Sequence, residues 1–96
     1  MADDATVVSL AGELDIASAP GLERQLEAAQ SSEPVKLVID LTALEFIDST
    51  GLRVLLTARR RASDARQALV LRNPRGQVRR IFEVSGVLEQ FSFNGD

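Results

Sequence analysis

Ninety-six residues are enough for one domain and too few for two, so we expect a single domain over residues 1–96. The 45% apolar content is typical of a globular protein, and four Phe without Trp or Tyr indicate a core of Leu, Val, Ile and Ala. The chain has no histidine and no cysteine, which excludes disulfides, thiol chemistry and a serine nucleophile activated by histidine.

The charge and hydropathy patterns also narrow the choice of partners. No apolar run reaches the roughly 20 residues that span a bilayer, and Met-Ala-Asp-Asp is no signal peptide, so we expect a cytoplasmic protein without a membrane partner. Residues 1–50 carry ten acidic and two basic residues, which disfavours nucleic acid as a partner. The arginines of the second half fit solvated helix faces better than a nucleic-acid site: Arg59, Arg60, Arg61, Arg79 and Arg80.

The first elements are a strand and a helix. Residues Ala5 to Ala11 predict a strand that Gly12 ends. Ser18 is a good N-cap for the following helix, Pro20 is tolerated in its first turn, and the helix should end near Ser31. Its buried stripe is predicted to contain Leu22, Leu26 and Ala29.

A second strand and a second helix follow. The nearly continuous apolar run Val35 to Leu41 is typical of a strand that is covered on both faces. We expect a loop from Thr42 to Ile47, and then an amphipathic helix from about Ser49 to Ala62 with Asp48 available as its N-cap.

The remainder predicts one more strand, a third helix and a last short strand. Residues Ala68 to Leu71 form the strand, Asn73 with Pro74 opens the helix, and Gly86 ends it. Residues Val87 to Phe93 hold a turn and a last strand. Strands that alternate with helices predict an α/β fold, with a mixed, mostly parallel sheet of about four strands and helices wound against it.

The residues that open the second helix are the main functional signal. Asp48, Ser49, Thr50 and Gly51 place an acid, two hydroxyls and a glycine at a helix start, where the first backbone N–H groups are unpaired and favour an anion. Without a histidine or cysteine as its base, Ser49 is placed to be modified and not to catalyse. From the residue types alone, Ser49 could equally be a helix cap.

A receiver-type phosphoacceptor is one alternative. Asp15, Asp40 and Asp48 follow or end predicted strands, and clustered carboxylates could hold magnesium. That chemistry also needs a lysine at the end of a late strand, whereas the sole lysine, Lys36, begins an early one. We therefore expect no enzyme activity, no metal and no cofactor.

Three blocks of the chain resemble the signature blocks of a STAS domain, specifically of the anti-sigma factor antagonists. They are GELDIASAPGLERQL, LVIDLTALEFIDSTGLRVLL and RNPRGQVRRIFEVSGVLEQF. The resemblance implies transcription regulation by partner switching, in which an anti-sigma factor with serine kinase activity is the partner and a metal-dependent serine phosphatase reverses the modification. It places the phosphorylated residue at Ser49 and favours phosphorylation over capping there.

The expected place of several residues beside Ser49 makes them candidates for a partner-binding surface, although Glu13 and Asp15 could equally be ordinary loop acids and Arg53 could be solvated. The members of this surface are Glu13, Asp15, Asp48, Ser49, Thr50, Gly51 and Arg53. The missing side chain of Gly51 is expected to let a partner approach, so that Gly51→Ala leaves the thermal midpoint nearly unchanged or slightly raised.

One departure from the family pattern concerns the start of the chain. The additional strand that usually precedes the one at Thr6 to Leu10 is expected to be short or missing, which would uncover a strand edge and allow a homodimer. A scaffold role in a lipid-transport or stress-sensing assembly, as in other relatives, stays open.

Overall fold

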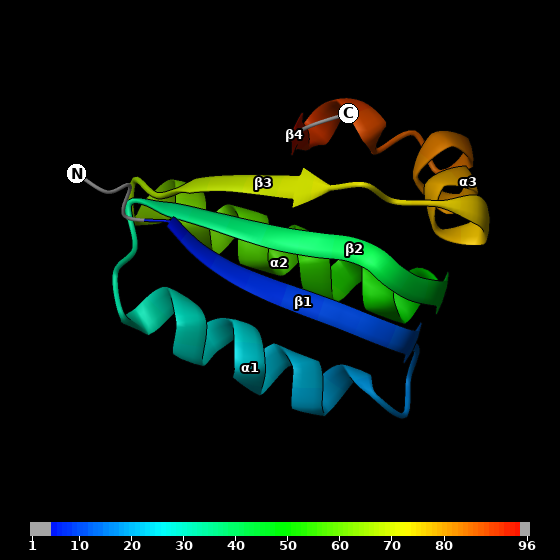
Figure 1. Ribbon diagram of the computed structural model, residues 1–96, viewed down its shortest axis with the longest axis horizontal. Helices are drawn as coiled ribbons and strands as arrows, with labels where there is room; N and C mark the ends of the chain where they lie inside the picture. The colour runs from blue at the N-terminus through cyan, green and yellow to red at the C-terminus, as the bar shows by residue number, and fades with distance from the viewer. Residues whose placement is uncertain (1–4, 95–96) are drawn as a thin grey trace.

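The computed structural model describes residues 5–94, which form one four-stranded sheet with three α-helices (Figure 1). The strands are β1 (Ala5–Leu14), β2 (Lys36–Ile47), β3 (Ala68–Arg72) and β4 (Ser92–Asn94). The helices are α1 (Ala19–Ser31), α2 (Ser49–Asp64) and α3 (Gly76–Val84), and the 3-10 turn η1 (Leu88–Gln90) precedes β4. The expected α/β architecture is confirmed.

The sheet order is β1-β2-β3-β4, and every pairing between the described strands is parallel. The sequence allowed a mixed sheet, and the part of the chain that the structure describes has no antiparallel pairing. The expectation of a short or missing first strand falls on residues 1–4, which lie outside the described residues. Within residues 5–94, β1 is an edge strand of the sheet.

The core lies between one face of the sheet and the helices α1 and α2, with α2 behind the sheet in Figure 1. Strand register places Val8 beside Ile39 and Ile39 beside Leu71, which gives one inward-facing apolar row. The predicted stripe of α1 packs against this core through Leu22 and Leu26. Burying one such side chain stabilises the fold by about 1.5–3 kcal/mol.

β2 runs through the stretch that was expected to be a loop, so the predicted loop at residues 42–47 is wrong. The register between β1 and β2 shifts twice, and each shift is a bulge that gives β2 one extra residue. As a result, the buried residues Leu41, Leu44 and Ile47 come at every third position instead of every second. That spacing does not have the alternation by which a strand is recognised.

The end of β1 and the start of α1 also differ from the expectation. Gly12 does not end β1, because its φ of 80° falls at the second bulge and the strand continues to Leu14. Ser18 occupies the N-cap position of α1 as predicted, but its side chain makes no capping hydrogen bond. Its hydroxyl instead donates to Glu13 O (2.8 Å) and accepts from Asp15 N (3.0 Å), which closes the turn between β1 and α1.

The C-terminal part follows the prediction closely. β3 extends one residue past Leu71, and α3 begins at Gly76, two residues after the Asn-Pro pair. Gly86 lies just beyond the end of α3 with φ of 76°. Phe82 of α3 stacks on Phe91, and Phe93 of β4 packs edge-on against both, with ring centroids 5.6–6.5 Å apart. These contacts join α3 to β4.

Candidate functional site

The site lies at the carboxyl-terminal edge of the sheet, where β2 passes into α2. Asp48 is the N-cap of α2, as predicted, and its Oδ1 accepts a hydrogen bond from Gly51 N at 3.0 Å. Its own N–H donates to Leu14 O at 3.2 Å, which ties the start of α2 to the end of β1. Asp48 therefore both begins the helix and fixes it against the edge strand.

Ser49 is the first residue of α2, and its side chain is exposed. Asp48 supplies the cap, so the alternative in which Ser49 caps the helix is not needed. Ser49 makes no side-chain hydrogen bond to another described residue. As the first residue of α2, Ser49 lies at the positive end of the helix dipole, where an added anion is stabilised. Thr50, which follows it, is partly buried, and Arg53, one turn further, is exposed.

Gly51 is buried, so the expectation that it forms an open docking position is wrong. A Cβ at this position would lie 2.5 Å from Leu14 Cγ, 2.6 Å from Leu14 O and 2.9 Å from Ile47 Cγ1. The missing side chain makes room for the end of β1 and not for a partner. Gly51 thus allows the close contact between α2 and β1 that positions Ser49.

The three aspartates of the receiver alternative serve separate hydrogen-bonding networks. Asp15 Oδ1 accepts from Ala17 N (3.0 Å) and Ser18 N (3.1 Å), which holds the turn after β1. Asp48 is the cap described above, and Asp40 lies further back along β2. Among residues 5–94, no group of three or more potential metal-ligating side chains comes together.

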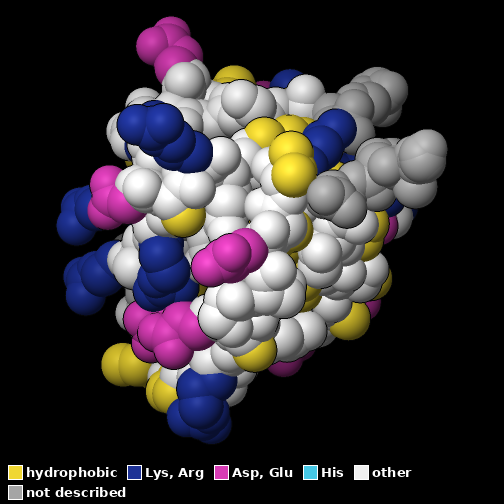
Figure 2. Space-filling view, turned by 90° about the vertical axis from the view of Figure 1, so that its left-hand side faces the viewer, with side chains coloured by type: hydrophobic (Ala, Val, Ile, Leu, Met, Phe, Trp, Pro, Cys, Tyr) yellow, Lys and Arg dark blue, Asp and Glu magenta, His cyan; other side chains and the backbone are white. Residues whose placement is uncertain are grey.

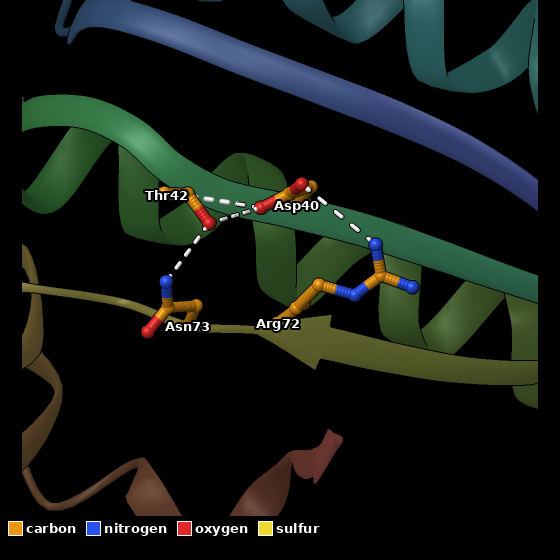
Figure 3. Close-up of polar contacts among 4 residues, drawn as sticks. All are labelled: Asp40, Thr42, Arg72 and Asn73. Atoms are coloured by element: carbon orange, nitrogen blue, oxygen red, sulfur yellow. Dashed lines mark hydrogen bonds and ion pairs between the residues drawn. The ribbon is translucent and has the colours of Figure 1, made fainter. Parts of the chain in front are cut away.

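Asp40 is the centre of a polar cluster that bridges β2 and β3 (Figure 3). Its Oδ1 accepts from Thr42 Oγ1 (2.6 Å) and Thr42 N (3.0 Å), and Arg72 Nη1 lies 3.8 Å from its Oδ2. The hydroxyl and the backbone N–H of Thr42, with a smaller contribution from Arg72, hold the pKa of Asp40 below its ordinary value. Asn73 Nδ2 donates to Thr42 Oγ1 at 3.0 Å. The cluster therefore fastens the first bulge of β2 to β3.

Gln77 of α3 is a residue that sequence reasoning missed. Its Oε1 accepts from Ile47 N (3.0 Å), and its Nε2 donates to Ile47 O (2.9 Å). β3 pairs with β2 only as far as Asp40, so the amide of Gln77 satisfies the backbone of β2 where no strand is present. Nothing in the local sequence distinguishes this glutamine, because its partner is 30 residues away.

Two exposed apolar residues, Ile16 and Phe46, also lie at this edge and were not predicted. Phe46 pairs in register with Glu13, whose side chain is exposed. Beside the same turn, a groove of about 280 Å³ runs between β1 and α1, and its lining includes Glu13, Leu14 and Ser18. The sequence signal that could have found Ile16 is a large apolar residue in the turn between Asp15 and Ser18.

The end of the molecule opposite the site, on the left in Figure 1, has a surface of mixed charges. Figure 2 shows Lys and Arg side chains interspersed with Asp and Glu on its left-hand side, and not a patch of one sign. Arg61 Nη2 lies 3.5 Å from Glu27 Oε2 at this end, and the comparable pair Arg79–Glu83 (3.1 Å) lies on α3, at the end of the molecule that carries the site. Such a mixture is typical of solvated helix surfaces. Along residues 5–94, none of the helices combines the length and the apolarity that crossing a membrane requires.

Comparison with known proteins agrees with this architecture. The family model described as "Mlab, STAS domain" matches residues 1–90. The anti-sigma-B factor antagonist of Listeria monocytogenes is 36% identical over 80 residues, which cover 83% of this chain and 70% of that protein.

Solved structures extend the similarity to three dimensions. An anti-sigma factor antagonist from Mycobacterium paratuberculosis has a TM-score of 0.88 and 32% identity, over 100% of this chain and 81% of that one. The antagonist SpoIIAA is similar in fold in its unphosphorylated form (TM-score 0.79, 23% identity, 100% and 84% coverage). Its phosphorylated form gives a TM-score of 0.71 at 22% identity, with 100% and 87% coverage. The chain therefore belongs to the STAS domain family and is similar to its anti-sigma factor antagonists in sequence and in structure.

Proposed function

We propose that this chain is an anti-sigma factor antagonist that is switched by phosphorylation of Ser49. The unmodified chain binds an anti-sigma factor that is also a serine kinase, and sigma factor is released. Phosphorylation by that kinase frees the anti-sigma factor, and a serine phosphatase restores the binding form. The observation that carries the proposal is the exposed hydroxyl of Ser49 at the first position of α2, beside the Asp48 cap.

The relatives support a role of this kind. The Listeria and Mycobacterium proteins are named as anti-sigma factor antagonists, and SpoIIAA, which has the same fold, is known in an unphosphorylated and a phosphorylated form. None of these names describes an enzyme, and we propose that this chain too acts by binding and not by catalysis.

Phosphorylation of Ser49 is compatible with the folded domain. The phosphoryl group adds about 1.5 to 2 negative charges at pH 7. At the N-terminus of α2 this charge is stabilised by about 0.3–1 kcal/mol, and it leaves the buried contacts of Leu52 and Leu55 intact. The effect of the modification therefore falls on the interface with the partner.

Charge repulsion gives a physical reason for release. The kinase must place the γ-phosphorus of ATP in line with Ser49 Oγ, which attacks it while the bond to ADP breaks and a base of the kinase takes the hydroxyl proton. After transfer, the phosphoserine faces the phosphates of ADP and the carboxylate of Asp48. Like charges in a buried interface cost several kcal/mol, which corresponds to a loss of affinity of about a hundredfold or more.

The proposal is tested by incubating this chain with ATP and, in turn, with each purified anti-sigma factor kinase of the source organism, and by measuring binding and phosphate incorporation. We expect one kinase to bind and to add a single phosphate, located at Ser49 by mass spectrometry. Ser49→Ala should abolish labelling and keep binding, and Ser49→Asp should weaken binding while its circular dichroism stays that of a folded domain. Ser63→Asp, an exposed serine at the other end of α2, is the matched control and should bind normally.

Two results would refute the switch. Labelling that persists in Ser49→Ala places the modification elsewhere, and Ser49→Asp binding as tightly as the parent leaves a constitutive scaffold, as in lipid-transport or stress-sensing assemblies. Labelling of an aspartate from acetyl phosphate and magnesium would instead favour the receiver alternative.

A further inference from the structure

Two large apolar side chains are exposed to solvent at the end of the sheet where α2 and Ser49 begin. Ile16 is 75% exposed and Phe46 is 40% exposed. Single exposed apolar residues are common on protein surfaces, so their significance depends on their setting. Here both belong to the end of the sheet at which α2 and Ser49 begin.

The backbone connects the two residues to Ser49. Leu14 O accepts the hydrogen bond of Asp48 N (3.2 Å), and Leu14 pairs in register with Ile47. Ile16 lies two residues after Leu14, and Phe46 lies two residues before Asp48. Both side chains therefore belong to the edge formed by the ends of β1 and β2 and the start of α2.

The backbone of both residues lies in hydrogen-bonded structure. Ile16 belongs to the turn that the carboxylate of Asp15 closes, and Ala19 N donates to Asp15 O at 2.8 Å in the same turn. Phe46 lies within the paired part of β2. Because the backbone is already ordered, a partner that covers these side chains loses little conformational entropy on binding.

Acidic residues lie close to this apolar pair along the chain. The stretches 13–17 and 45–50 contain four acids and no lysine or arginine, while Arg53 lies one turn into α2 and Arg75 lines a groove together with Glu45. The carboxylates of Asp15 and Asp48 accept backbone hydrogen bonds, whereas Glu13 and Glu45 are exposed and form no ion pair with the described residues. A partner surface that is complementary to this edge therefore has apolar pockets with basic residues beside them.

We propose that Ile16 and Phe46 are the apolar anchors through which the anti-sigma factor holds the unphosphorylated chain, with lysines or arginines of that partner next to Glu13 and Glu45. This inference rests on the proposed function and assigns separate roles within one surface. Ile16 and Phe46 supply most of the affinity, because buried apolar side chains near the centre of an interface dominate binding. Ser49 supplies the switch.

Calorimetric titration of the full chain with the anti-sigma factor kinase identified above tests the anchors. Ile16→Ser and Phe46→Ser should each weaken binding about tenfold or more. The matched controls are Val35→Ser, at the opposite end of the strands, and Val84→Ser, at the end of α3, which expose 62% and 71% of their side chains. Both controls should stay within about twofold of the parent.

Thermal melting of each variant separates lost anchoring from lost folding. Ile16 is exposed enough for its substitution to leave the midpoint unchanged, so Ile16→Ser decides the question if Phe46→Ser is destabilised. Glu13→Lys and Glu45→Lys should slow association at low salt, and the difference should vanish at high salt.

The outcomes distinguish this inference from the function on which it rests. If Ser49→Asp weakens binding while Ile16→Ser and Phe46→Ser bind like the two valine controls, the anchors are wrong and the switch stands. If Ser49→Asp also binds like the parent, the switch is wrong as well. If no anti-sigma factor kinase binds the parent, both proposals fail.

Discussion

Alanine in place of Gly51 would put a methyl group where the end of β1 already lies. The added carbon would be 2.5 Å from Leu14 Cγ and 2.6 Å from Leu14 O. The side chain of Leu14 could turn away, but its carbonyl oxygen is held by the hydrogen bond from Asp48 N. The strand and the helix must therefore move apart, and this also disturbs the cap that Asp48 forms with Gly51 N.

The cost of this clash exceeds the gain in helix propensity. Overpacking a tight core site costs about 1–3 kcal/mol, and an added carbon only 2.5–2.6 Å from its neighbours belongs at the upper end of that range, about 3 kcal/mol. Alanine recovers about 1 kcal/mol over glycine inside a helix, which leaves a net destabilisation of about 2 kcal/mol. For a domain of this size, that loss lowers the thermal midpoint by about 8–16 °C.

Gly21 provides a matched control, because it also lies inside a helix and a Cβ there meets nothing within 4 Å. Gly21→Ala should raise the stability by about 0.5–1 kcal/mol. Thermal and urea unfolding of the two variants and the parent give the comparison directly. A Gly51→Ala variant as stable as the parent or as Gly21→Ala would refute the close contact between α2 and β1.

Two further substitutions test the contacts that hold β2. The lowered pKa of Asp40 means that its carboxylate stabilises the fold above its unfolded pKa of about 3.9 and loses this contribution as pH falls through the lower folded value. Asp40→Asn should thus flatten the acid limb of the stability curve measured by urea unfolding; an unchanged limb would show that Thr42 does not stabilise the charge. Gln77→Leu should lower the free energy of unfolding by about 1–3 kcal/mol and speed hydrogen exchange at the Ile47 amide. Gln77→Glu can accept from Ile47 N but cannot donate to Ile47 O, so its stability should lie between those of the parent and Gln77→Leu. Unchanged exchange at Ile47 would rule out the pairing.

Features set by local chemistry were predictable from the sequence. The end of α1 at Ser31, the start of α2 at Ser49 and the position of Gly86 after α3 follow from capping residues and apolar spacing. Asp48 was also predicted as a cap, because a carboxylate before a helix start has one common use. These signals act within a few residues, so the sequence order contains all of their information.

Features that depend on distant partners were not predictable. The bulges of β2 are visible only against its register with β1, and they turn an alternating strand pattern into a spacing of three. The burial of Gly51 depends on Leu14, and the role of Gln77 depends on Ile47, each more than 25 positions away in the chain. Family resemblance predicted Ser49 as the phosphorylated residue, but it did not show which of its neighbours are exposed and which are buried.

The phenylalanine cluster allows circular dichroism to follow one part of this domain separately from the rest. Without Trp or Tyr, the near-ultraviolet dichroism of the chain arises from its four phenylalanines, and Phe82, Phe91 and Phe93 pack together where α3 meets β4. Phe46 stands apart from them and is partly exposed. The near-ultraviolet signal therefore reports chiefly on this corner, whereas the far-ultraviolet signal reports on all helices and strands. A partner that disturbs the packing between α3 and β4 but not the structure around Ser49 would change the near-ultraviolet signal and leave most of the far-ultraviolet signal unchanged.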